Sequence, residues 1–247
     1  MSLGPAQAET AVPSPDNPPL LARLKGIIIR PRPTFAAVVM RPQAAGALAL
    51  LTLISFGATA AVLATEVGQV ALVDQWERTA LAYGQTVDDA RYAEMQRLSR
   101  YGVPYAAASV AARGPVAAIV LAAVLYGVFR ARGRRATFVQ VLAVVAHAGV
   151  ILTLRDAVAA PLNYMRESLS SPLTVISMAG MLDEGSPLAR FLSLLDVFVL
   201  WWLLVLAVGV AVLYHARARF VALALLGSYA GIALLLAATM AVLGGNR

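Results

Sequence analysis

The residues that could do chemistry in this 247-residue chain are a few charged and polar side chains within long apolar stretches. The clearest is Asp196, the one carboxylate in FLSLLDVFVLWW, residues 191–202. Arg113 and Arg155 stand in two other apolar stretches. Because a helix rises about 1.5 Å per residue, all three lie roughly 24–27 Å from the basic end of their stretch. They therefore share one layer.

This shared layer predicts an ion pair. A charge near the edge of hydrocarbon seeks a partner, and a short carboxylate cannot extend to the headgroups as a long arginine can. We therefore expect Asp196 to point inward and to pair with Arg155 or Arg113. For the two arginines alone, the simpler interpretation is that they mark the outer ends of short helices and extend toward the headgroups.

His147 and Ser228 form a second candidate group, near the middle of their stretches. His147 lies about 14 Å from the basic end of its stretch, and the segment GSYAG places Ser228 at a similar depth between Gly227 and Gly231. A histidine that faces these hydroxyls could relay protons, whereas a buried histidine with a satisfied hydrogen bond is the more frequent arrangement. The two glycines are typical of close helix packing.

The sequence indicates no catalytic, metal or cofactor site. It has no cysteine and two histidines, and His147 and His215 differ by about 14 Å in depth, too far to ligate one metal ion or haem. HExxH motifs, nucleophile elbows and phosphate-binding glycine loops are missing. We expect no enzyme activity and no cofactor. The pI of about 10.2 does not indicate nucleic-acid binding, because basic loops beside membrane helices give the same surplus.

The elements that must position these residues are transmembrane helices. The chain is 60% hydrophobic and 13% charged, unlike a soluble domain. Five stretches are long enough to cross a hydrocarbon core of about 30 Å as helices. They cover residues 44–65, 105–129, 138–158, 191–214 and 220–243. The sequence thus predicts an all-α integral membrane protein with five transmembrane helices.

The arginines predict the orientation of these helices. Eleven of the 20 basic residues, with two acidic ones, precede the first span or lie in the loops after the second and fourth. Basic loops remain in the cytoplasm, so we expect a cytoplasmic N-terminus and an external C-terminus. The preference for arginine over lysine and the abundant alanine suit a bacterial protein, and hence the bacterial cytoplasmic membrane.

The chain divides into three parts by composition. Residues 1–19 are proline-rich and polar, which predicts a disordered tail. Residues 20–43 contain an amphipathic helix that Pro31 would end, and we expect it to lie on the cytoplasmic leaflet. Residues 44–247 form the membrane domain.

The amphipathic segment carries the candidate surface contacts. Anionic lipids would bind its basic residues, Arg23, Lys25, Arg30 and Arg32. The alternative is that the same face docks a protein partner. A homo-oligomer is a further expectation, and no nucleic acid is expected.

Two segments outside the spans are expected to form short helices on the external side. TVDDARYAEMQRLSRYG begins with a pattern similar to a capping box, Thr86 with Asp89, and ends at Gly102. SPLTVISMAGML, residues 171–182, is too short to span the membrane and too apolar for an ordinary loop, which predicts an interfacial or re-entrant helix.

Two segments also resemble a known family. IIIRPRPTFAAVVMRPQAAGALALL, with its Pro-x-x-Thr-Phe element, resembles the entry to the first span in bacterial members of the Yip domain family of Ypt-interacting membrane proteins. LLDVFVLWWLLVLAVGVAVL is similar to that family's fourth span, where Asp196, Phe198, Trp201 and Gly209 match the pattern. The resemblance implies a five-helix membrane domain with a cytoplasmic N-terminus. Eukaryotic members are linked to Rab-type GTPases, but their Asp-Leu-Tyr-Gly-Pro signature does not occur in this sequence, which argues against the same binding here.

The leading functional hypothesis is a non-enzymatic membrane protein that organises lipid or protein partners. The alternative is a small permease or channel for ions or another small solute, in which Asp196 and His147 line a polar path. A continuous cavity between the layers of these two residues would favour the alternative.

Overall fold

The computed structural model of the chain describes residues 18–169, 174 and 191–244. Apart from one isolated bridge between Thr174 and Asp196, the regular structure in these residues is helical. Five helices are long and apolar enough to cross a membrane: Ala44–Leu63, Gly102–Ala131, Phe138–Met165, Val197–Tyr214 and Ala218–Met240. The all-α fold and the five expected spans are confirmed.

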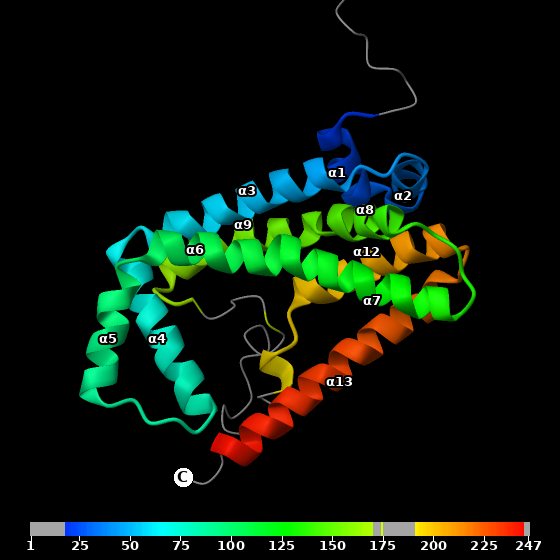
Figure 1. Cartoon of the computed structure of the whole chain (residues 1–247). Coiled ribbons are helices and arrows are strands. Elements are labelled where there is room, and N and C mark those ends of the chain that lie inside the picture. Colours follow the sequence, from blue (N-terminus) through cyan, green and yellow to red (C-terminus); the bar gives the residue numbers. More distant parts are fainter. Residues whose placement is uncertain (1–17, 170–173, 175–190, 245–247) are drawn as a thin grey trace, which may run out of the picture.

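The elements follow one another along the chain as shown in Figure 1. They are α1 (Leu20–Ile29), α2 (Pro31–Met40), α3 (Ala44–Leu63), α4 (Glu66–Ala82), α5 (Asp89–Ser99), α6 (Gly102–Ala111), the π-helical turn η1 (Ala112–Val116), α7 (Ala117–Ala131), α8 (Phe138–Ala148), α9 (Val150–Met165), α12 (Val197–Tyr214) and α13 (Ala218–Gly244). The second span consists of α6, η1 and α7, and the third consists of α8 and α9.

The spans form a bundle with a different cap at each end (Figure 1). Helix α3 packs along α8 and α9, α12 lies against α8 and α9, and α13 leans against α12. Helices α1 and α2 lie at the end where α8 begins and α12 ends, whereas α4 and α5 lie at the opposite end. These are called the α1/α2 end and the α4/α5 end below.

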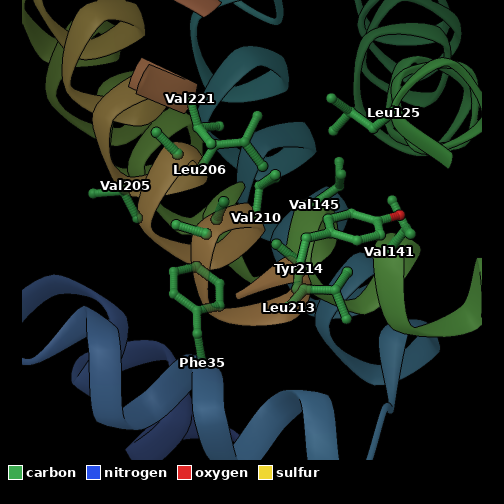
Figure 2. Close-up of a cluster of buried hydrophobic side chains, with 14 of the residues drawn as sticks. Phe35, Leu125, Val141, Val145, Val205, Leu206, Val210, Leu213, Tyr214 and Val221 are labelled. Atoms are coloured by element: carbon green, nitrogen blue, oxygen red, sulfur yellow. The ribbon is translucent and has the colours of Figure 1, made fainter. Parts of the chain in front are cut away.

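The main core lies between α8 and α12, near the α1/α2 end. Val141, Val144, Leu206 and Val210 are fully buried in it. Figure 2 shows that Phe35 of α2 enters the same cluster from the side of the N-terminal helices. The N-terminal segment is therefore an integral part of the folded bundle and contributes to its apolar core.

Helix α2 is an element that the sequence analysis missed. Pro31 ends α1, as expected, but it also occupies the first position of α2, where its missing N–H costs nothing. Gln140 anchors α2 because its Nε2 donates to the Val39 carbonyl at 3.2 Å. Residues 20–43 therefore contain two helices, α1 and α2, where the sequence analysis expected one helix that Pro31 ends.

Other boundaries also differ from the prediction. The fourth span begins at Val197 rather than at residue 191, which makes Asp196 its N-cap. Helix α4 was not predicted; the Thr65 side chain caps it by accepting a hydrogen bond from the Gly68 N–H at 3.0 Å. The cap of α5 is Asp88 rather than Thr86. Most of the predicted helix 171–182 and of the predicted disordered tail lies outside the described residues.

Candidate functional site

Asp196 stands where α12 begins and caps it. Its Oδ1 accepts hydrogen bonds from the backbone N–H of Phe198 at 2.8 Å and of Val199 at 3.4 Å. The first N–H groups of a helix lack intrahelical partners, and the helix dipole favours a negative charge there. The carboxylate in the apolar stretch is therefore a helix cap as well as a charge.

The other carboxylate oxygen of Asp196 holds Arg155. The Arg155 Nε donates to Asp196 Oδ2 at 2.6 Å, and Arg155 Nη1 lies 3.3 Å from Asp156 Oδ1. The Asp196 side chain is 7% exposed, whereas the side chains of Arg155 and Asp156 are 25% and 30% exposed. Because both groups of the short pair are charged, this is a strong class of hydrogen bond, and it joins α9 to α12.

Tyr229 of α13 completes this layer. Its hydroxyl donates to the Leu194 carbonyl at 2.6 Å and accepts from the Asp196 N–H at 3.4 Å. The sequence analysis placed the hydroxyl groups of GSYAG near His147 rather than beside Asp196, and it overlooked Asp156. The sequence could have pointed to Asp156, because it is a carboxylate in an apolar stretch and directly follows Arg155.

Arg113 lies apart from the ion pair. It belongs to η1, and its Nε and Nη2 donate to the carbonyl and hydroxyl oxygens of Ser109, both at 3.2 Å. Among the described residues, no carboxylate lies within 4.0 Å of it. The structure thus joins Asp196 to Arg155 and not to Arg113.

His147 and Ser228 do not meet. His147 is fully buried, and its Nδ1 lies 2.8 Å from the Ala143 carbonyl, so Nδ1 carries the proton that forms this bond. Its Nε2 has no partner among the described residues. Ser228 is exposed and donates to the Ala224 carbonyl of its own helix at 2.8 Å.

The glycine pair beside Ser228 also faces away from the bundle. A Cβ added at Gly227 or Gly231 would meet nothing within 4 Å. The expected packing of this pair against another helix of the described chain is therefore wrong.

Two cavities extend along the bundle near the ion pair. The first, of about 380 Å³, lies between α3, η1, α7, α9 and α12, and the second, of about 390 Å³, lies nearer the α4/α5 end. Arg113, Arg155 and Asp156 line both cavities. Neither cavity is lined by Asp196 or His147.

A third hollow, of about 640 Å³, opens at the α1/α2 end; we call it the arginine groove. Its lining consists of Arg30, Pro31, Arg32 and Pro33, Val208, Ala211 and Val212, and Ala216, Arg217 and Ala218. The three arginines are exposed. Arg217, from the turn between α12 and α13, was not among the predicted contact residues, because only the fold places it beside Arg30 and Arg32.

Of the four basic residues predicted to contact the membrane surface, Lys25, Arg30 and Arg32 are exposed. Arg23 is 6% exposed, and its Nη2 donates to Gln43 Oε1 at 2.9 Å. The prediction that Arg23 contacts the membrane surface is wrong, because the packing of α1 against the bundle encloses its side chain.

Comparison with known proteins identifies the family. Within the described residues, no group of three or more histidine, aspartate or glutamate side chains could hold a metal ion. No curated protein and no solved structure shows a significant match. The Yip1 domain profile matches residues 25–241, which include α2, the ion pair and both cavities. The chain, with its five potential membrane-spanning helices, therefore belongs to the Yip1 domain family of multi-pass membrane proteins.

Proposed function

We propose that this protein is a non-enzymatic organiser of the membrane, which binds anionic lipids at its cytoplasmic face and through them positions protein partners. The observation that carries this proposal is the arginine groove, in which Arg30, Arg32 and Arg217 stand around an apolar floor. The family is generally one of non-enzymatic membrane-trafficking proteins, which agrees with such a role.

The groove suits one lipid headgroup and part of its chains. A guanidinium group matches the oxygens of a phosphate in a fixed fork geometry. Val208 and Val212 provide an apolar surface beside these arginines. A cluster of arginines at the cytoplasmic boundary of a membrane is attracted to anionic lipids by about 1 kcal/mol for each basic residue.

The outer face of α1 extends the same surface. Leu21 and Ile29 are 70% and 60% exposed, and Lys25 is exposed between them. A helix with apolar and basic residues on its free face lies in the headgroup region, with the apolar residues among the acyl chains. The positive-inside rule assigns this end to the cytoplasm, in our proposal that of a bacterial cell.

The alternative role as a permease lacks a comparable observation. It requires a polar path between Asp196 and His147, and the described cavities are lined by neither residue. His147 contacts the carbonyl of its own helix and is fully buried. A homo-oligomer and a protein that docks on α1 remain predictions.

The experiment compares lipid retention by native mass spectrometry after reconstitution with equal amounts of phosphatidylglycerol and phosphatidylcholine. The test variant combines Arg30→Gln, Arg32→Gln and Arg217→Gln. The control combines Arg41→Gln, Arg132→Gln and Arg135→Gln, which removes the same charge from exposed residues outside the groove. We expect the test variant to lose its preference for phosphatidylglycerol and the control to keep most of it. Equal losses in the two variants would show that overall charge, rather than the groove, attracts the lipid.

A further inference from the structure

We infer that the two cavities at Arg113 form a single binding site for a membrane amphiphile that carries a phosphate and an ammonium group. One acyl chain would occupy the first cavity. The headgroup would lie at Arg113 and Asp156 and extend into the second cavity. The volumes, about 380 and 390 Å³, fall in the range of roughly 300–1,000 Å³ for small-molecule sites.

The first cavity changes in polarity along its length. Arg113, Arg155 and Asp156 line its end toward α4 and α5, whereas Leu48 and Val145 line its end toward α1 and α2. A water-soluble solute would give the aliphatic end no apolar contacts. A plain hydrocarbon would give the charged end no hydrogen-bond partners. An amphiphile matches both.

The length of the first cavity matches one leaflet. Its lining runs along the third span from Val145 to Asp156, a rise of about 16 Å for eleven residues. One leaflet of a hydrocarbon core of about 30 Å is about 15 Å thick. A single acyl chain would therefore extend from the charged residues to the middle of the membrane.

The charges that line the site determine the headgroup. Arg155 is held by Asp196 at 2.6 Å, and Asp196 lines neither cavity. Asp156 also lies 3.3 Å from Arg155, so two carboxylates share one guanidinium, and Asp156 keeps negative charge that Arg155 does not balance. Arg113 and Asp156 therefore face the same space as one positive and one negative group. A phosphate would accept hydrogen bonds from Arg113, and an ammonium would donate them to Asp156. A purely anionic headgroup would be repelled by Asp156.

The second cavity provides a polar space for such a headgroup. Gln75, Tyr105, Ser109 and Asn163 contribute to its lining. These amide and hydroxyl groups provide hydrogen-bond donors and acceptors for the polar part of the ligand.

The local backbone holds Arg113 between the two cavities. Pro115 lies inside the π-helical turn η1, and such turns occur frequently at functional sites. Gly114 allows η1 to approach α3, since a Cβ there would lie 3.3 Å from the Thr52 Oγ1.

Trp202 gives the inference a local probe, because it lines the first cavity, whereas neighbouring Trp201 lines neither. With Trp76→Phe and Trp201→Phe, only Trp202 fluoresces, since the chain has three tryptophans. The ligands are lysophospholipids brominated on the acyl chain, added to protein in neutral detergent, with ethanolamine, choline or glycerol headgroups. Bromine quenches only nearby indoles.

The control protein carries Trp76→Phe and Trp202→Phe, which leaves Trp201 as the reporter.

We expect the lysophosphatidylethanolamine to quench Trp202 with saturation, at a concentration roughly tenfold lower than the choline or glycerol lipid. Trp201 should show no headgroup preference. Arg113→Gln should remove the preference, while Arg100→Gln, an exposed arginine at the same end, should retain it. Asp156→Asn should shift the preference to the anionic lysophosphatidylglycerol.

Equal quenching of Trp202 by all three lipids would overturn the inference, and so would strongest quenching of the unaltered site by the glycerol lipid. Relief of quenching by inorganic phosphate would also overturn it, because it would indicate a site for soluble anions. The variant with glutamine at Arg30, Arg32 and Arg217 should retain full quenching. Lipid binding at the arginine groove and binding at Trp202 can therefore fail independently.

Discussion

The ring of Phe35 lies against Gly209, so closely that a Cβ on the glycine would be 2.9 Å from the Phe35 Cε1 and 2.6 Å from a methyl group of Val144. Phe35 comes from α2 and Gly209 from α12. The contact joins the two sequence segments that suggested the family. In this chain, therefore, the glycine of the fourth span leaves room for the aromatic ring that precedes the first span.

The first prediction follows from this contact. Gly209→Ala should destabilise the protein by about 1–3 kcal/mol, because the added methyl group overpacks a buried junction. Gly227→Ala is the matched control, since its Cβ would enter open space, and alanine has the higher helix propensity. Melting in detergent would measure both. A Gly209→Ala protein as stable as the control would show that α2 does not pack on α12.

The two roles of Asp196 can be separated. Asp196→Asn removes the charge next to Arg155 but keeps an oxygen that can cap α12, whereas Asp196→Ala removes both. Loss of one member of a buried pair costs about 3–5 kcal/mol, and loss of a cap costs about 1 kcal/mol more. We expect Asn to be intermediate between Asp and Ala in unfolding free energy. Equal stability of the Asn and Ala variants would refute the capping role.

Double-mutant cycles distinguish the partners of Asp196. The pair of substitutions Asp196→Ala and Arg155→Leu should cost about 1–3 kcal/mol less than the sum of the single ones, because in the double variant neither member of the Asp196–Arg155 pair is left without the other. Asp196→Ala with Arg113→Leu should be additive to within about 0.5 kcal/mol. Coupling to Arg113 instead of Arg155 would contradict the arrangement described above.

Arg23 and Arg30 should differ in their effect on stability. Arg23→Gln disrupts a buried guanidinium that bonds to Gln43, and we expect a cost of about 1–3 kcal/mol. Arg30 is exposed, and Arg30→Gln should change the unfolding free energy by less than about 0.5 kcal/mol. The measurement is thermal melting in the same neutral detergent. Equal effects would mean that α1 is not packed on the bundle.

Periodicity and apolar length were sufficient to predict the five spans, because lipid leaves few alternatives to a helix. Depth alone predicted that Asp196 pairs with an arginine of its own layer, but it did not decide between Arg155 and Arg113. The depth of a residue places it in a layer of the membrane, but it does not say toward which neighbouring helix its side chain points. The cap at Asp196 was missed since a hydropathy pattern does not show where a helix begins.

Features that depend on several distant segments could not be predicted. The arginine groove needs Arg217 beside Arg30 and Arg32, an arrangement that only the packing of α2 on α12 produces. Arg23 looked like its neighbours Lys25 and Arg30 in the sequence. Its partner Gln43 follows α2, a helix that the sequence analysis did not predict.

The side of the membrane on which the arginine groove lies tests the central claim most directly. The chain has no cysteine, so single cysteines can be placed at Ala216, which lines the groove, and at Gln85, which is exposed in the connection between α4 and α5. An impermeant maleimide is applied to intact bacterial cells that express each variant. We predict labelling of the cysteine at 85 in intact cells and of the cysteine at 216 only after permeabilisation. Labelling at 216 in intact cells would place the groove outside and contradict its proposed binding of cytoplasmic anionic lipids.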